Sequence, residues 1–345
     1  MKTIKVILVG YGYWGPNLAR NVLLNPSYEL VGVVETDAER RKKAQETLRV
    51  KCYESFTEFS EKESIDLVII ATRPASHLII AKHFINLGCH LIITKPCCIS
   101  KEEVDVLFNL AKQNGIKVFV DYTYLYSPLI RHLKTSPTCQ EIIEQSRNYT
   151  SYRTSLGIIQ SDVDVVMDLA VHDLSILLYL KERLPIRAQC IPIGGFSPLK
   201  VVNALVLLEW SDGFTAFIHV SWLSPIKIRN ITISSSISSI FINETNAKNP
   251  IEIFEISPPF SDLTHLSLSQ SIKRNISYTV GNSTNPLIES FEPLSRLLEE
   301  VAGILTGQDI EFNISSENFT LGIWKIVESL EKSLEIGGLK VAIEQ

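Results

Sequence analysis

The sequence IKVILVGYGYWG, residues 4–15, joins an apolar strand to a glycine-rich turn, and a helical pattern follows from residue 16. In a G-x-G-x-x-G turn of this kind, Gly10 permits the tight turn and Gly12 lets the backbone approach a pyrophosphate. Gly15 lets the helix pack closely against the strand. The helix N-terminus then offers N–H groups and partial positive charge to phosphates. The turn therefore predicts dinucleotide binding, against the alternative of an ordinary glycine-rich turn.

A carboxylate at the end of the next strand supports this prediction. The apolar run at residues 30–34 ends at Glu35, 20 residues after Gly15. At this point of a dinucleotide-binding fold, a carboxylate accepts hydrogen bonds from the adenosine ribose hydroxyls. Strand, glycines, helix and acid thus follow one another in the expected order.

Length and composition narrow the class of protein. At 345 residues the chain suits two domains, and 45% hydrophobic with 21% charged residues is typical of a globular protein. The net charge of −5 disfavours a nucleic-acid partner. No apolar run approaches the roughly 20 residues of a membrane helix, and no signal peptide is recognised, so we expect a cytoplasmic protein without a membrane partner. The six cysteines lack zinc-type spacing, so no metal is predicted.

The order of strand and helix patterns predicts two domains. Up to residue 121 they alternate, as a doubly wound parallel sheet requires, and residues 1–122 form the expected α/β Rossmann domain for NAD. The predicted strands are 4–9, 29–35, 66–71, 90–93 and 116–120, and the predicted helices are 16–24, 38–47, 77–87 and 101–113.

Residues 123–345 are expected to form an α+β domain for substrate binding and oligomerisation, with a large, mostly antiparallel open sheet. One helix is predicted at about 164–181, and the C-terminal helices at about 288–306 and 316–335 are expected to pack back on the first domain. Residues 257–285 are predicted to be a loop. The predicted strands are 187–195, 201–210, 214–223, 227–235, 238–243 and 250–256.

Two loops follow parallel strands, at the edge of the sheet where ligands bind in such folds. Residues 71–77 contain His77, a candidate ligand contact that is equally well explained as a structural histidine at a helix start. Residues 94–96 read Thr-Lys-Pro, and Lys95 directly follows a buried strand. Its ammonium is a candidate for the site, with a solvated surface lysine as the alternative.

The helix at about 164–181 carries a third candidate group. Asp164, Asp168 and His172 are spaced at i, i+4 and i+8, so they are expected to share one face. A histidine one turn from an acid suits a general base. A helix-surface pair is one alternative; a metal site is another, but no third ligand at convincing spacing is evident.

Together these residues resemble the Gfo/Idh/MocA oxidoreductase family through nearly the whole chain. The resemblance rests on residues 10–17, the loop at 71–77, Lys95-Pro96, and the stretch Asp168-Leu-Ala-Val-His172-Asp173. Residues 156–168 and His219-Val-Ser-Trp222-Leu are similar to a narrower branch that serves nucleotide-sugar and surface-polysaccharide pathways, and Tyr13-Trp14 also marks that branch.

The resemblance implies a nicotinamide enzyme that oxidises a secondary alcohol of a sugar or reduces the ketone. His172 is then the acid/base, Lys95 polarises the hydroxyl oxygen, and Asp168 holds substrate and base in register. With no arginine directly after Glu35, NAD is favoured over NADP. The predicted cofactor contacts are Gly10, Gly12, Tyr13, Trp14, Gly15, Glu35, Arg40, Thr72, Pro74, His77, Thr94 and Lys95.

Three positions depart from the family pattern. Thr94 replaces a glutamate before Lys95, Cys97-Cys98 replaces small residues after the proline, and Val171 replaces a common proline before His172. The loss of the carboxylate at position 94 predicts lowered or redirected activity, whereas the thiols are most simply explained as packing groups.

The favoured substrate is a nucleotide-linked sugar, for instance a UDP-N-acetylhexosamine or its uronate oxidised at C3. Tyr124, Arg153, Gln160 and His172 are the candidate contacts; an arginine suits a carboxylate or diphosphate, and a sheet-edge arginine is the alternative. A cyclitol dehydrogenase and a non-catalytic NAD-binding regulator are the other functions considered. The outward residues of the second sheet, among them Val202, Val206, Leu208 and Phe217, predict an apolar face for a homodimer or homotetramer.

Overall fold

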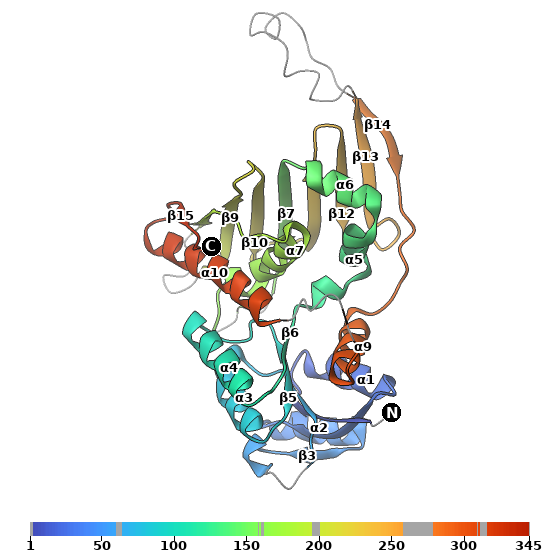
Figure 1. The fold of residues 1–345 in the computed structure, drawn as a ribbon, viewed down its shortest axis with the longest axis vertical. Coiled ribbons are helices and arrows are strands. Elements are labelled where there is room, and N and C mark those ends of the chain that lie inside the picture. Colours follow the sequence, from blue (N-terminus) through green and yellow to red (C-terminus); the bar gives the residue numbers. More distant parts are fainter. Residues whose placement is uncertain are drawn as a thin grey trace, which may run out of the picture. The chain divides into compact units, whose positions relative to one another are not determined.

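The structure is a computed structural model that describes residues 3–59, 64–157, 159, 162–194, 201–257, 279–308, 310 and 316–344 (Figure 1). Its contacts divide the chain into two compact units. The first comprises Met1–Ser127 and Phe291–Trp324, and the second comprises Pro128–Ser290 and Lys325–Gln345. The two units are described separately below.

The first unit is built on a six-stranded sheet in the order β3-β2-β1-β4-β5-β6, in which all neighbours are parallel. This order confirms the predicted doubly wound fold, since the chain starts in the middle and extends to both edges. The short edge strand β3 was not predicted. The strands are β1 (Ile4–Val9), β2 (Tyr28–Val34), β3 (Lys51–Tyr53), β4 (Leu67–Ile70), β5 (His90–Thr94) and β6 (Val118–Asp121).

α1 to α4 lie between these strands, as the alternating pattern predicts, whereas α9 comes from much later in the chain. The helices are α1 (Gly15–Leu24), α2 (Ala38–Leu48), α3 (His77–Asn86), α4 (Lys101–Gln113) and α9 (Pro293–Leu305), with short 3₁₀ turns η1 (Phe56–Glu58), η2 (Pro74–Ser76) and η3 (Thr123–Tyr126). α9 packs beside α1 (Figure 1). The Tyr28 hydroxyl donates to the Leu298 carbonyl oxygen at 2.6 Å, and Arg20 pairs with Glu292 at 2.6 Å. These contacts attach α9, from the C-terminal part of the chain, to α1 and β2 of the first unit.

The second unit contains a nine-stranded sheet in the order β14-β13-β12-β11-β7-β10-β9-β8-β15. Only the central pair β7 and β10 is parallel among the described ladders, so the predicted mostly antiparallel sheet is confirmed. The strands are β7 (Asn148–Thr154), β8 (Arg187–Pro192), β9 (Asn203–Glu209), β10 (Thr215–Ser221), β11 (Ile228–Ser234), β12 (Ser238–Asn243), β13 (Ile251–Ser257), β14 (Thr279–Thr284) and β15 (Val341–Ala342).

Helices cover one face of this sheet (Figure 1). They are α5 (Pro128–Thr135), α6 (Pro137–Gln145), the single π-helical turn η4 (Val166–Ala170) and α7 (Val171–Lys181); α10 (Glu317–Glu335) is shared between the two units. α5, α6 and β7 were not predicted. β14 lies in the predicted loop at 257–285, whose residues 258–278 are outside the described part of the chain.

The side chains of the sheet alternate between a buried and a part-exposed face. Val202, Val206 and Leu208 are 4%, 0% and 0% exposed, so they belong to the buried face and the prediction that they point outward is wrong. Phe217 does lie on the part-exposed face, because the residues of β10 that alternate with the buried Ala216 and Ile218 point to that face. The register pairs Leu208 with Ala216 and Leu207 with Phe217, which places Leu207, not Leu208, beside Phe217.

Candidate functional site

The glycine turn between β1 and α1 leaves no room for side chains at two of its three glycines. Gly10 has φ +98°, and a Cβ there would lie 2.6 Å from the Ala71 carbonyl oxygen; a Cβ on Gly15 would lie 2.4 Å from the Gly10 carbonyl oxygen. At Gly12 the nearest atom to an added Cβ is Nη1 of Arg40, at 3.5 Å. Gly10 and Gly15 therefore shape the turn, whereas Gly12 keeps backbone accessible on the side where a pyrophosphate would approach.

The N-terminus of α1 fits an anionic ligand. α1 begins at Gly15 with Pro16 in its first turn, and among the described side chains none caps its N-terminal N–H groups. Uncapped N–H groups and the helix dipole favour a phosphate at this point. Tyr13 is 88% exposed beside the turn. The predicted dinucleotide cofactor is therefore compatible with the residues present.

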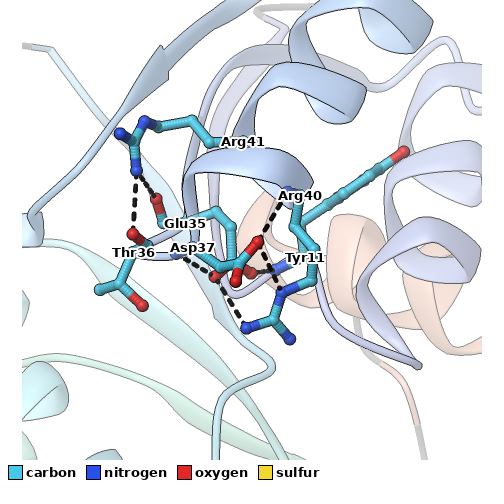
Figure 2. A network of polar contacts seen from close by, with 6 residues as sticks. All are labelled: Tyr11, Glu35, Thr36, Asp37, Arg40 and Arg41. Atoms are coloured by element: carbon cyan, nitrogen blue, oxygen red, sulfur yellow. Dashed lines mark hydrogen bonds and ion pairs between the residues drawn. The ribbon is translucent and has the colours of Figure 1, made fainter.

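Glu35 connects the second strand to the glycine turn (Figure 2). Its Oε2 accepts the Tyr11 backbone N–H at 2.8 Å, and its Oε1 accepts the Asp37 backbone N–H at 2.9 Å. The carboxylate is buried at 6% exposure. Each carboxylate oxygen has two lone pairs, so these backbone contacts hold Glu35 in place and leave it able to accept a ribose hydroxyl.

Arg40 lies between Glu35 and Gly12. Its Nη2 is 3.5 Å from Glu35 Oε1, and its guanidinium also pairs with Asp37 (Figure 2). The Asp37 carboxylate caps α2, and the hydrogen bond from the Arg40 backbone N–H lowers the Asp37 pKa. The Arg40 side chain is half exposed, so it presents a cation next to the Glu35 carboxylate. Both residues were predicted as cofactor contacts, but the sequence pattern did not indicate that they pair with each other.

His77 joins the two ligand-side loops from inside the domain. Its Nδ1 lies 3.1 Å from the Pro96 carbonyl oxygen, and its Nε2 lies 3.1 Å from the Thr72 carbonyl oxygen. The side chain is fully buried. The prediction that His77 contacts the cofactor is corrected: it holds the Thr72-to-Pro74 loop against the Lys95-Pro96 loop, the structural role considered as its alternative.

The Lys95 loop begins at the end of β5. The Thr94 hydroxyl donates to the Ile70 carbonyl oxygen at 3.2 Å, and the Lys95-Pro96 peptide bond is cis. Lys95 is partly exposed. Cys97 and Cys98 are buried, and the hydrogen bond to Cys97 together with burial raises the pKa of the Cys98 thiol. Both thiols are therefore packing groups of this loop, as expected.

Asp121, which sequence reasoning missed, lies at the end of β6 directly opposite Thr94. Its Oδ2 accepts the Trp14 indole N–H at 3.1 Å, and its Oδ1 accepts the Thr123 hydroxyl at 2.7 Å. The carboxylate is only 1% exposed. The one indication in the sequence was its position: Asp121 ends a parallel strand, at the edge of the sheet where ligands bind in such folds.

In the second unit, the π-helical turn η4 changes the expected geometry around Asp168. The Asp164 carboxylate accepts the backbone N–H groups of Val166 and Met167 at 2.9 Å and so begins the helix. The π turn winds more residues per turn than an α-helix, so the 3.6-residue spacing does not apply through it. Asp168 Oδ2 accepts the Trp222 indole N–H at 2.9 Å.

His172 is the second residue of α7 and is buried at 9% exposure. The Ser175 hydroxyl donates to its backbone carbonyl oxygen at 2.7 Å. The adjacent Asp173 points into the interior, where its carboxylate accepts Tyr149 OH at 2.7 Å, Ser151 Oγ at 2.6 Å and Arg153 Nε at 2.8 Å. Strand β7 thus holds Asp173, which directly follows the candidate base His172 on α7.

The other substrate candidates have mixed outcomes. Arg153 is 1% exposed and pairs with both Asp173 and Glu244, so the prediction that it contacts a substrate is corrected to an interior ion pair. It also lies on a central strand and not at a sheet edge. Tyr124 is part-exposed in η3, whereas Gln160 lies outside the described residues.

Comparisons with known proteins define the class. Residues 4–122 match the sequence profile described as "Oxidoreductase family, NAD-binding Rossmann fold", that of GFO_IDH_MocA. The match covers residues 4–122 alone, so it shows that this part of the chain has the NAD-binding Rossmann fold of the Gfo/Idh/MocA oxidoreductases, and it indicates an oxidoreductase with a nicotinamide cofactor. No helix within the described residues has the length and apolar character to cross a membrane.

A curated relative, UDP-N-acetylglucosamine 3-dehydrogenase of Acidithiobacillus ferrooxidans, is 26% identical over 221 residues, covering 63% of this chain and 68% of its own. Its solved structure has a TM-score of 0.78 at 18% identity, covering 98% of this chain and 99% of that one. A putative NADPH-dependent oxidoreductase from Desulfitobacterium hafniense has a TM-score of 0.81 at 16% identity, covering 99% and 98%. These structural likenesses establish the fold, and the dehydrogenase relative supports the nucleotide-sugar branch.

Proposed function

We propose that this chain transfers hydride between NAD and a secondary alcohol or ketone of a nucleotide-linked sugar. The proposal rests on the glycine turn, whose Tyr11 backbone N–H donates a hydrogen bond to Glu35. The backbone at Gly12 is accessible in this turn, beside the buried Glu35 carboxylate. The UDP-N-acetylglucosamine 3-dehydrogenase relative supports a UDP-N-acetylhexosamine, or its uronate, as the substrate class.

The proposed chemistry assigns one role to each candidate residue. NAD, when bound, accepts or returns the hydride. His172 takes the hydroxyl proton during oxidation and returns it during reduction, which is the work of a general acid/base. Lys95 places a positive charge at the hydroxyl oxygen and stabilises alkoxide character. Asp168, fixed by Trp222, accepts a hydrogen bond from the substrate and keeps it in register with His172.

The test of this function is turnover. The purified chain is mixed with NAD and UDP-N-acetylglucosamine, its uronate, dTDP-sugars or inositol, and the absorbance of reduced nicotinamide is followed. We expect turnover with a UDP-sugar. Turnover of inositol alone would replace the substrate class by a cyclitol. If the chain binds NAD but neither oxidises any of these alcohols nor reduces the corresponding ketones with NADH, the enzyme assignment is overturned in favour of an NAD-binding regulator.

The preference for NAD is proposed from the balance between Glu35 and Arg40. A 2′-phosphate would meet the buried Glu35 carboxylate, whose repulsion the half-exposed Arg40 offsets only in part. Replacing Glu35→Gln is expected to raise the ratio of kcat/KM for NADP over NAD by about tenfold or more, because one like charge is removed at contact distance. Steady-state kinetics with both cofactors measure this ratio.

The control for that variant is Glu46→Gln, which removes one carboxylate from the exposed side of the same helix α2. It should leave the cofactor ratio unchanged. An unchanged ratio in Glu35→Gln as well would mean that Glu35 does not govern the choice of cofactor.

We also propose self-association through the part-exposed face of the second sheet. Tyr152, Phe217 and His219 form an aromatic row on this face, with ring centroids 6.2 and 5.9 Å apart. Large aromatic side chains that stay exposed on a broad sheet are typical of an interface between subunits. Sedimentation velocity of the purified chain should give a dimer or tetramer, whereas a monomer at micromolar concentration would remove this proposal.

A further inference from the structure

A pocket of about 270 Å³ lies in the second unit, between α6 and the C-terminal ends of α5 and α7. α5 packs against both α6 and α7 (Figure 1). Lys181 is the last residue of α7 and His172 is the second, so about 14 Å of helix separates the pocket from the candidate base. The charged residues that line the pocket are Lys134, Glu144, Lys181, Glu182 and Arg183.

Lys181 places a mostly buried ammonium in this pocket. Its side chain is 7% exposed, and its Nζ lies 4.0 Å from Asp212 Oδ2 and 4.1 Å from the centroid of the Phe214 ring. Neither contact is a hydrogen bond, and the ammonium donates none to any other described residue. An ammonium has three N–H donors, and withdrawing it from water is costly unless acceptors replace the water. The described part of the chain supplies no such acceptor.

The neighbouring charges compensate Lys181 only in part. Lys134 is 12% exposed and forms an ion pair with Glu182. Arg183 forms an ion pair with the same Asp212 oxygen that lies nearest to Lys181, so one carboxylate is shared by two cations. Burial lowers the pKa of Lys181, and the charge of Asp212 does not fully offset this. Three cations thus face two paired carboxylates, which leaves a positive charge in excess.

Complementing a helix dipole does not account for this arrangement. A lysine in the last turn of a helix is favourable there even when its side chain is solvated. Lys181 is instead mostly buried against an aromatic ring and lines a pocket. Glu144, the remaining carboxylate of the lining, is exposed and forms no ion pair with a described residue. Because exposed charges are screened by water, Glu144 opposes an anion at Lys181 only weakly.

We propose that this pocket binds a small oxyanion, a phosphate or carboxylate group, whose oxygens accept hydrogen bonds from the Lys181 ammonium. Lys134 supplies a second positive charge from the end of α5. The volume of the pocket lies below that of clefts for drug-sized ligands, so it fits a free phosphate or a small carboxylic acid and not a nucleotide-linked sugar. The proposal goes beyond the proposed oxidoreductase function, and its test needs neither NAD nor sugar.

Hydrogen–deuterium exchange of the whole chain, followed by mass spectrometry, tests the proposal. Inorganic phosphate or acetate replaces sodium chloride at constant ionic strength. We expect the bound anion to slow exchange in peptides that span residues 133–144 and 178–183, and the concentration dependence gives Kd. This readout is local, so phosphate bound at the N-terminus of α1 does not contribute. A lower Kd for phosphate would assign a phosphate group, and a lower Kd for acetate would assign a carboxylate.

Two variants should change this Kd in opposite directions. Lys181→Met keeps a long side chain and removes the charge, so Kd should rise about tenfold or more, because hydrogen bonds from a charged donor are lost. Asp212→Asn removes the competing charge but keeps an oxygen for the Phe214 backbone N–H, so Kd should fall by about threefold or more. Lys332→Met is the matched control: it removes the lysine of an exposed ion pair on α10 and should leave Kd unchanged.

The absence of slowed exchange in both peptides, with either anion, would overturn the proposal. An equal Kd in the unchanged chain, Lys181→Met and Asp212→Asn would overturn it too, and Lys181 would then be a structural lysine that packs on Phe214. If Lys181→Met does not fold, as judged by circular dichroism, Lys134→Met takes its place. That variant should also raise Kd, and an unchanged value would contradict the proposed site.

Discussion

Replacing Asp173→Asn is expected to lower the free energy of unfolding of the second unit by about 3–5 kcal/mol. Asp173 is fully buried, and its partner Arg153 is 1% exposed. Three donors converge on the Asp173 carboxylate, from Tyr149, Ser151 and Arg153. An asparagine has one oxygen to accept them and no charge, so the guanidinium would stay in the interior without its closest counter-charge.

Glu244 does not replace Asp173. Its Oε1 is 3.6 Å from Arg153 Nη2, longer than the 2.8 Å between Arg153 Nε and Asp173. Burial raises the pKa of Glu244, while the charge of Arg153 lowers it. The loss of Asp173 therefore leaves the Arg153 charge poorly compensated, and a buried charge of this kind is the mechanism of a large destabilisation.

Urea unfolding followed by circular dichroism and tryptophan fluorescence measures this change. Glu328→Gln is the control, because it breaks an exposed ion pair with Lys332 on α10, which should contribute at most about 0.5 kcal/mol. The double variant Asp173→Asn with Arg153→Met should lose less stability than the sum of the two single variants, since both remove the same pair. Additive losses would show that the two residues do not act as a pair.

Much of the first unit was predictable because local sterics determine it. Gly10 has a left-handed φ and contacts Ala71, so the glycine is required by the backbone and not only by function. The apolar run before it and the acid at Glu35 follow from the same fold, and the structure confirms the strand order around them. Arg40 was predicted as a cofactor contact, but its ion pair with the Glu35 carboxylate is visible only in the folded unit.

The central strand β7 shows why part of the second unit escaped prediction. Its inward-facing residues include Tyr149, Ser151 and Arg153, which are polar, so the strand lacks the alternation of apolar and polar residues that marks a half-buried strand. These residues are buried because Asp173 of α7 satisfies them. A partner distant in sequence therefore determines the strand, and a local pattern cannot reveal it.

The same reason applies to the candidate site residues. The spacing of Asp164 and His172 predicted one helix face, but a π turn lies between them and Asp164 begins the helix instead. Trp222 was noticed only as part of a branch motif, and its bond to Asp168 gives that motif a physical role. Asp121 had no sequence signal beyond its place at a strand end, since its partners Trp14 and Thr123 meet it only in the folded unit.

Replacing His172→Asn is expected to lower kcat for sugar oxidation by about 10²–10⁴, the usual contribution of a general acid/base. The side chain is buried on α7, whose backbone is fixed here by the Ser175 hydroxyl and by the Asp173 network beside it. A histidine whose backbone is fixed so firmly can transfer a proton at a constant position. NAD affinity should be unchanged, because the glycine turn and Glu35 belong to the first unit.

The measurements are steady-state rates over a range of pH, together with the Kd for NAD by calorimetry. The acid limb of the rate profile, which reports the base that must be unprotonated for oxidation, should disappear in His172→Asn.

Asp168→Asn should keep this limb and mainly raise the KM for the sugar, because it changes a substrate contact and not the base. His90→Asn is the matched control: His90 begins β5, where its Nδ1 accepts the Lys117 backbone N–H, and its loss should leave kcat within about twofold. If His172→Asn kept both its rate and its acid limb, the proton acceptor would have to be a different group, and the assignment of α7 as the catalytic helix would be wrong.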